Sequence, residues 1–122
     1  MLKKLLLILI FSLILPVIAG EYEDALKNNE KIFLYFYTDE CGYCQKFKPF
    51  FESFSKIYGE KCKFLAIDGN TNYGKNLAQK FRIRFLPYVI LVDVKKDNGL
   101  VINPDCLQKY SCTNDIIKEF TK

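Results

Sequence analysis

The chain has 122 residues, five of them cysteines, and it contains no histidine. The absence of histidine excludes Ser-His-Asp and Cys-His catalysis, Cys2His2 zinc sites and His-ligated haem. The formal net charge is +4, but without Lys3 and Lys4 the 16 remaining basic residues face 14 acidic ones, so no basic surface favours a nucleic acid as partner. The high cysteine count makes cysteine chemistry the leading candidate for function.

Residues 1–19 have the order of segments typical of a secretory signal peptide. A basic start is followed by an apolar run over residues 5–19, and small residues at Ala19 and Gly20 suit cleavage. The alternative is a retained membrane anchor, although the run is shorter than the roughly 18 apolar residues that a spanning helix needs. In both cases the remaining domain, residues 20–122, is expected outside the cytoplasm, where disulfides persist. We therefore expect an exported protein of the bacterial periplasm or the extracellular face.

Helical and strand-like patterns alternate along residues 20–122. Apolar residues spaced by three and four predict helices over about 22–27, 44–58, 73–81 and 113–120, the second containing Pro49 and the last capped by Thr113. Runs of apolar, β-branched and aromatic residues predict strands over 31–37, 63–67, 87–94 and 100–102, with Asn98-Gly99 in a hairpin turn. This order predicts an α/β fold, with a central mixed four- to five-stranded sheet flanked by helices on both faces.

The sequence Cys41-Gly42-Tyr43-Cys44 lies where the first strand ends and the longest helix begins. The first turn of a helix has free N–H groups and a partial positive charge, which stabilise a thiolate. In a C-x-x-C motif at such a position the pKa of a cysteine can fall to ~7 or lower. We expect Cys41, at the loop tip, to be the attacking nucleophile, and Cys44, facing inward, to resolve the mixed disulfide.

The C-x-x-C spacing also occurs at haem attachment sites, in zinc ribbons and in structural disulfides. Gln45 follows the second cysteine, so the C-x-x-C-H haem signature is absent. A zinc site would need the three other cysteines to converge on the pair, and none of them forms a second C-x-x-C. We expect no metal and no cofactor, and a structural disulfide stays as the alternative to a redox-active one.

The strand KIFLYFYTDE, the Cys41–Cys44 motif, Lys46 and Pro49 resemble the thioredoxin superfamily, and so does Ile83-Arg84-Phe85-Leu86-Pro87 before an apolar strand. The resemblance covers about residues 22–122 and implies a thioredoxin-like fold. It implies that Pro87 is a cis-proline beside the two cysteines. It also implies that the backbone of Leu86 pairs with an extended substrate strand, next to Gly42 and Tyr43.

Three positions depart from the pattern of thioredoxins. Tyr35 stands where the family has a buried carboxylate that assists the resolving cysteine, and Tyr37 and Glu40 stand where tryptophans are usual. Asp39 or Glu40 is a candidate to replace the carboxylate through water, and a solvated helix entrance is the alternative reading of both. Their negative charge opposes the helix dipole at Cys41. The Gly-Tyr dipeptide is similar to that of periplasmic disulfide isomerases, and the whole motif resembles small exported thioredoxin-like proteins.

The remaining cysteines are Cys62, Cys106 and Cys112. Cys106 and Cys112 flank a short segment before the last helix, and we expect them to form a structural disulfide; a second redox centre is the alternative. Cys62 is expected to be a buried thiol that packs as a small hydrophobic residue, and a regulatory or dimer-forming thiol is the alternative.

These features predict an enzyme that exchanges its Cys41–Cys44 dithiol and disulfide with protein substrates, as a reductant or isomerase rather than a primary oxidase. Its expected partners are protein thiols and disulfides and a membrane-bound electron donor, and a monomer is expected. The alternatives are a thioredoxin-fold adaptor with a structural disulfide and a metal carrier.

Overall fold

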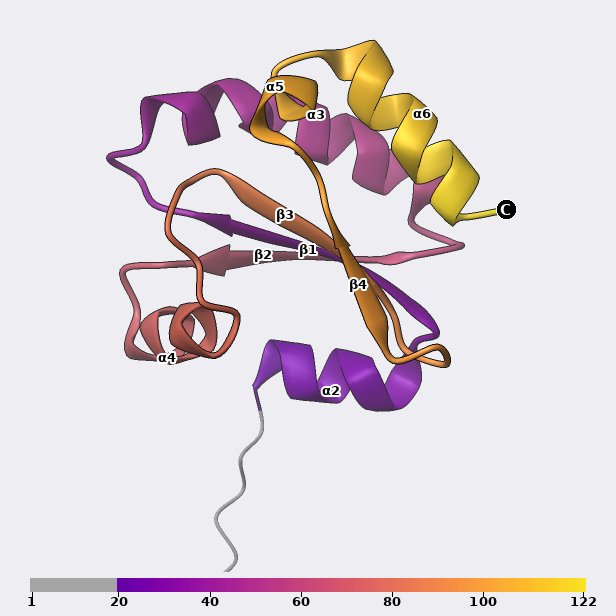
Figure 1. Ribbon diagram of the computed structural model, residues 1–122, viewed down its shortest axis with the longest axis horizontal. Helices are drawn as coiled ribbons and strands as arrows, with labels where there is room; N and C mark the ends of the chain where they lie inside the picture. The colour runs from indigo at the N-terminus through magenta and orange to yellow at the C-terminus, as the bar shows by residue number, and fades with distance from the viewer. Residues whose placement is uncertain (1–19) are drawn as a thin grey trace, which may run out of the picture.

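The computed structural model describes residues 20–122, so the predicted signal peptide lies outside the described residues. Helices and strands alternate as far as the third strand, and a β-hairpin followed by two helices completes the range (Figure 1). In chain order they are α2 (Glu21–Asn28), β1 (Lys31–Tyr37), α3 (Gly42–Tyr58), β2 (Lys63–Asp68), α4 (Asn72–Lys80), β3 (Tyr88–Asp93), β4 (Asn98–Val101), α5 (Pro104–Leu107) and α6 (Tyr110–Phe120).

The four strands form one mixed sheet in the order β2-β1-β3-β4. Strand β1 is parallel to β2 and antiparallel to β3, and β4 returns antiparallel to β3. Helices α3, α5 and α6 lie on one face of the sheet, and α2 and α4 lie on the other (Figure 1). The prediction of a mixed sheet covered on both faces is therefore confirmed, with four strands.

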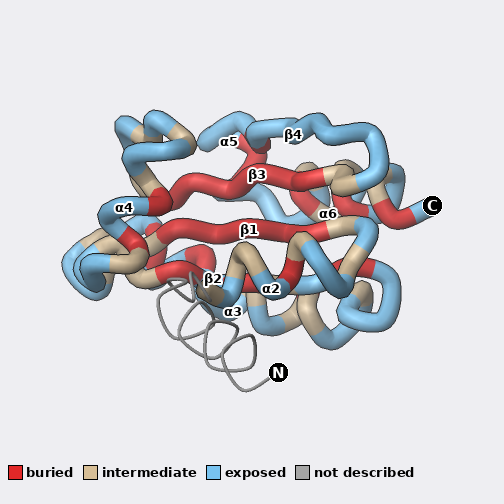
Figure 2. Tube along the Cα trace, turned by 90° about the horizontal axis from the view of Figure 1, so that it is seen from below, coloured by how far each residue is buried: buried red, intermediate tan, exposed pale blue. Residues whose placement is uncertain are grey.

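Strand β1 is apolar without alternation because helices cover both of its faces. Five consecutive residues, from Ile32 to Phe36, are buried. Phe33 and Tyr35 point into a core shared with α3 and α6, whereas Leu34 and Phe36 belong to a second core with α2 and α4. Figure 2 shows the two central strands buried along most of their length, with the edge strand β4 exposed.

The long helix α3 buries one apolar stripe against the sheet. Cys44, Phe47 and Phe54 are buried along it, at spacings of three and seven residues. Ile57, which the helical spacing also places among the apolar positions, is 58% exposed. Pro49 lies inside the helix, as its sequence position requires.

The hairpin between β3 and β4 differs from the sequence prediction. Asn98 and Gly99 belong to β4, and the residue with positive φ is Asp97, at 50°. Asn98 pairs with Asp93 in the sheet, so the turn consists of the four residues 94–97. Gly99 has a packing role instead, because a Cβ there would lie 2.7 Å from Cδ1 of Ile90.

The last helix also begins earlier than predicted, at Tyr110, because Thr113 does not cap it. Thr113 is fully buried, and its hydroxyl donates a hydrogen bond to the carbonyl oxygen of Cys106 at 2.8 Å. The short helix α5, which the sequence pattern did not reveal, precedes it. Asn103 caps α5 through a hydrogen bond from the backbone N–H of Asp105 to its side-chain oxygen at 2.8 Å.

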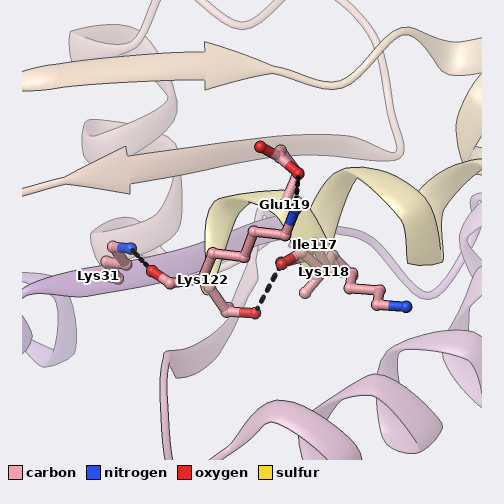
Figure 3. Close-up of polar contacts among 6 residues, drawn as sticks. Lys31, Ile117, Lys118, Glu119 and Lys122 are labelled. Carbon is pink, nitrogen blue, oxygen red and sulfur yellow. Dashed lines mark hydrogen bonds and ion pairs between the residues drawn. The ribbon is translucent and has the colours of Figure 1, made fainter.

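Lys31, at the start of β1, holds the end of α6 against the sheet. Its Nζ donates hydrogen bonds to the carbonyl oxygens of Phe120, at 2.6 Å, and Lys122, at 3.4 Å. Figure 3 shows the second of these contacts beside the ion pair of Glu119 and Lys122. A cation at a helix C-terminus is favourable because the last carbonyl groups carry partial negative charge.

Within residues 20–122, no helix combines the length and the apolar character that a membrane crossing requires.

Candidate active site

Cys41 is the N-cap of α3. Its backbone is extended, with φ −79° and ψ 109°, and its carbonyl oxygen accepts the first intrahelical hydrogen bond, from the N–H of Gln45 at 3.1 Å. Its sulfur accepts a hydrogen bond from the backbone N–H of Cys44 at 3.1 Å. A sulfur in this position faces the free donors and the positive end of the helix, which is the arrangement that stabilises a thiolate.

Cys44 lies one turn inside the helix and is 3% exposed, whereas Cys41 is partly exposed. The two form a disulfide, with Cα atoms 5.2 Å apart. A molecule from outside therefore reaches Cys41 more readily than Cys44. This difference in access is what an attacking and a resolving cysteine require.

Tyr35 reaches the redox pair from β1. Its hydroxyl donates a hydrogen bond to the carbonyl oxygen of Cys44 at 3.1 Å. Burial, together with the neighbouring Tyr37, raises the pKa of Tyr35 to about 12. The hydroxyl therefore stays neutral at physiological pH and acts as a hydrogen-bond donor to the helix backbone.

The loop before β3 contains the predicted cis-proline. The Leu86–Pro87 peptide bond is cis, and Pro87 is buried. Leu86 and Pro87 line a groove of about 560 Å³. Tyr43 and Phe47, at the start of α3, line the same groove. The structure thus brings Leu86, Pro87 and Tyr43, three of the residues predicted to act at the site, to one groove.

Gly42 and Tyr43, between the two cysteines, are exposed. A Cβ added to Gly42 would meet no atom within 4 Å, so the space beside the motif is open. Tyr43 is 58% exposed, and Nζ of Lys46 lies 5.4 Å from the centre of its ring. An apolar ring and a cation thus stand together at the edge of the groove.

A cavity of about 420 Å³ lies on the Tyr35 side of Cys44. Asp39 and Lys48 line it together with Cys44 and Tyr35. Glu40 does not line it: its carboxylate accepts a hydrogen bond from Nδ2 of Asn70 at 2.9 Å, and this bond lowers the pKa of Glu40. Of the two carboxylates that the sequence offered as a proton acceptor, Asp39 is therefore the one that shares a cavity with the resolving cysteine.

The family model for thioredoxin matches residues 14–110 of the chain. The chain belongs to the thioredoxin family. Its paired cysteines lie at the strand-to-helix corner where a thiol–disulfide oxidoreductase of that family needs them.

The sequence is similar to those of two known thioredoxins, and the fold is similar to that of a solved thioredoxin structure. Mitochondrial thioredoxin-2 of Schizosaccharomyces pombe is 28% identical over 70% of this chain and 62% of its own length. The thioredoxin of Borreliella burgdorferi is 26% identical over 83% of this chain and 82% of its own. The structure of a mutant thioredoxin from Halobacterium salinarum covers 84% of both chains at 25% identity, with a TM-score of 0.68.

None of the other three cysteines of this thioredoxin-family chain is bonded to the redox pair. Cys106 and Cys112 form the second disulfide, with Cα atoms 5.3 Å apart. Cys62 is free and buried before β2, among residues of the core shared with α3 and α6. Burial raises the pKa of the Cys62 thiol to about 12, so it stays protonated. Within residues 20–122, no three His, Cys, Asp or Glu side chains gather as a metal ion would require.

The sequence analysis did not identify the groove residues that come from α5 and the segment after it. Pro104, Leu107 and Gln108 line the groove, opposite the start of α3. They lie about 60 residues after the redox motif in the printed sequence and carry no motif of their own. The Pro at the first position of α5 and the Asn103 cap were the available signals, since together they are typical of a helix start.

Proposed function

We propose that the protein is an exported thiol–disulfide oxidoreductase that reduces or isomerises disulfides of protein substrates. The observation that carries the proposal is the unequal access to a bonded pair: Cys41 is partly exposed at the mouth of α3, and Cys44 is buried behind it. Its match to the thioredoxin family supports the same chemistry.

The reaction proceeds in two exchange steps. In the reduced protein the Cys41 thiolate attacks one sulfur of a client disulfide, and the other client sulfur leaves as a thiolate that takes up a proton. Cys44 then loses its proton and attacks Sγ of Cys41, which closes the protein disulfide and releases the second client thiolate. Two electrons have passed from the protein to the client.

In the second step Cys44 must lose a proton inside the protein. The resemblance to thioredoxins implies a carboxylate at the position of Tyr35. The raised pKa of Tyr35 keeps its hydroxyl protonated, so it donates a hydrogen bond and does not accept the proton of Cys44. Asp39 lines the cavity that reaches Cys44, and a cavity of about 420 Å³ has room for water. We assign to Asp39 the role of proton acceptor, through water in this cavity.

Two opposing electrostatic effects around α3 bear on the direction of electron flow, and the reduction potential reports their balance. The helix start and the N–H of Cys44 favour the reduced form with its thiolate, which makes the pair more oxidising. The exposed carboxylates of Asp39 and Glu40 oppose this effect. A reduction potential near that of thioredoxin, about −270 mV, supports a reductant, and one near −120 mV contradicts it.

Export is proposed from the sequence of residues 1–19, with a membrane-bound protein as the electron donor. Expression of the full chain in a bacterium followed by fractionation tests it. Export predicts that the protein is recovered from the periplasm or the membrane, and a mass that begins at residue 20 supports cleavage. Recovery from the cytoplasm with residues 1–19 intact contradicts it.

The test of the activity is the dithiothreitol-driven reduction of insulin. The Cys41→Ser variant is expected to fall to the uncatalysed background, and Cys62→Ala, which removes a buried thiol outside the pair, is expected to keep the activity. Activity that survives in Cys41→Ser contradicts the assignment of the nucleophile.

The Cys44→Ala variant separates an enzyme from an adaptor. Without its resolving cysteine an oxidoreductase accumulates mixed disulfides between Cys41 and its clients, which non-reducing gels show as bands that dithiothreitol removes. An adaptor with a structural disulfide forms none.

A further inference from the structure

The second disulfide encloses part of the wall of the groove. Leu107 and Gln108, which line the groove, lie between Cys106 and Cys112. Cys106 and Leu107 are buried, at 7% and 2% exposure, and Gln108 is exposed. The disulfide therefore closes a small loop, residues 106–112, whose inner side packs on the core while its outer side faces the groove. We call these residues the disulfide loop.

The disulfide loop is fixed to the helix that carries the redox pair. Tyr110, inside the loop, stacks on Phe54 with ring centres 4.7 Å apart and meets Phe50 edge-on at 5.4 Å. Its hydroxyl is 2.9 Å from Oγ of Ser53. Phe50 also lines the groove. One wall of the groove is formed by α3 and the other by the disulfide loop. The contacts of Tyr110 with α3 therefore fix the two walls relative to each other.

The disulfide is needed because α5 has little stability of its own. It spans only Pro104–Leu107, and an isolated helix of that length does not form in water. Two features hold its end in place: the hydrogen bond from Thr113 to the Cys106 carbonyl and the bond from Cys106 to Cys112. Without the covalent bond the groove wall is held only by the hydrogen bond of Thr113 and the contacts of Tyr110 with α3, so its position is less firmly fixed.

The groove is suited to an apolar side chain. The side chains that line it are mostly aromatic or aliphatic: Tyr43, Phe47, Phe50, Phe85, Leu86 and Leu107. Tyr43 and Phe85 are 58% and 44% exposed, so a ligand that covers them removes apolar surface from water. Among the described residues that line the groove, Lys46 alone carries a charge, so a basic ligand side chain is disfavoured there.

We propose that the disulfide loop is a specificity wall: the Cys106–Cys112 bond positions Leu107 and Gln108 so that the groove selects client segments with a large apolar residue beside the reactive cysteine. This inference rests on the proposed oxidoreductase function and names the class of client. Cys106 and Cys112 are positioning residues in this scheme and exchange no electrons with the client.

The test uses two peptides that differ only in the residue beside a single cysteine, Phe in one and Ser in the other. The cysteine carries thionitrobenzoate in a mixed disulfide, so attack by reduced Cys41 releases a coloured thiolate. The small probe is the symmetrical disulfide of thionitrobenzoate, which has no peptide to fill the groove. Single-turnover rates over a range of peptide concentrations separate the half-saturating concentration from the maximal rate.

The wild-type protein is expected to prefer the Phe peptide by about tenfold at low concentration, the scale on which an apolar pocket discriminates. In Cys106→Ala/Cys112→Ala the preference is expected to fall to about twofold, through a higher half-saturating concentration for the Phe peptide. The maximal rate and the rate with the small probe should stay unchanged. Cys62→Ala, the matched control, should keep the tenfold preference.

A wild-type protein without preference, or a double variant that keeps it, overturns the inference. Should the double variant fail to fold by circular dichroism, Gln108→Trp decides instead. This exposed position tolerates a large side chain, which narrows the groove while the disulfide stays intact. The Phe-to-Ser ratio is then expected to fall at least threefold, and an unchanged ratio rejects the wall. Failure of the wild-type protein to react with the small probe contradicts the oxidoreductase function itself, so the two failures are distinguishable.

Discussion

The hydroxyl of Tyr35 donates a hydrogen bond to the backbone carbonyl oxygen of Cys44 at 3.1 Å, inside the core. The bond joins the central strand β1 to the first turn of α3, where both cysteines of the redox pair lie. The resemblance to thioredoxins implies a carboxylate at this position, whereas the side chain present is a neutral donor. The position therefore supports the backbone of the site, and the proton of Cys44 needs another acceptor.

Tyr35→Phe removes this hydrogen bond and keeps the ring. We expect the free energy of unfolding to fall by about 1 kcal/mol, the ordinary net value of a buried hydrogen bond. The pH dependence of insulin reduction should stay as in the wild type between pH 6 and 9, because Tyr35 does not titrate there. Urea denaturation and pH–rate profiles measure the two effects. A shifted profile would show that the hydroxyl takes part in proton transfer.

Asp39→Asn is expected to slow the resolution of the mixed disulfide. Asp39 lines the cavity beside Cys44, and a positioned acid–base group contributes about a hundredfold or more to such a step. Glu40→Gln removes the same charge from the neighbouring residue, which bonds Asn70 instead, and serves as the control. Stopped-flow release of the second client thiol, followed from pH 5 to 9, compares them. Equal slowing by both variants would mean that Asp39 acts only through its charge.

Alkaline pH is expected to destabilise the fold between about pH 9 and 12. Burial raises the pKa of Cys62 from 9.0 and that of Tyr35 and Tyr73 from 10.0, each to about 12. The unfolded chain therefore loses these protons first, and stability that is complete below pH 9 declines as the pH rises. Urea unfolding at pH 8, 9, 10 and 11 measures the decline. Cys62→Ala should flatten it most between pH 9 and 10, because the thiol of the unfolded chain titrates ahead of the two tyrosines.

Lys31→Met is expected to lower the free energy of unfolding by about 1 kcal/mol, since it removes a cation from the C-terminal end of α6. Its Nζ bonds the carbonyl oxygen of Phe120 at 2.6 Å and lies 5.3 Å from the centre of the Phe120 ring. Met keeps the aliphatic packing and removes only the charge and the donors. The exposed Lys61 is the matched control, and Lys61→Met should change stability by less than about 0.5 kcal/mol.

The free energy of unfolding of Lys31→Met should be measured at low salt and at 1 M salt. At 1 M salt the Debye length is only about 3 Å, so the purely electrostatic part of the loss should shrink and the part due to hydrogen bonding should persist. A variant as stable as the wild type at low salt contradicts the role of Lys31.

The order of the elements and the position of the redox motif can be predicted from the amino-acid sequence. Residues 32–37 are apolar or aromatic without alternation, which is typical of a strand covered on both faces. Cys41-Gly42-Tyr43-Cys44 follows a short polar segment, at the start of a helical pattern. Both are local properties of the chain: hydrophobic spacing and the chemistry of neighbouring residues. For this reason the strand, α3 and the two active cysteines could be located without coordinates.

The surroundings of those cysteines depend on packing between elements, which the coordinates show. Tyr35 meets Cys44, Asp39 shares a cavity with it while Glu40 turns to Asn70, and the disulfide loop faces the groove beside Tyr43. The sequence predicts that α6 begins after Thr113, because threonine is a common N-cap. In the structure the Thr113 hydroxyl instead donates a hydrogen bond to the Cys106 carbonyl oxygen inside the core. Glu40 and Asn70 lie 30 residues apart in the chain, whereas Tyr35 and Cys44 are only nine apart but belong to different elements. Local periodicity carries no information about how a strand and a helix pack on each other, whatever their separation in the chain.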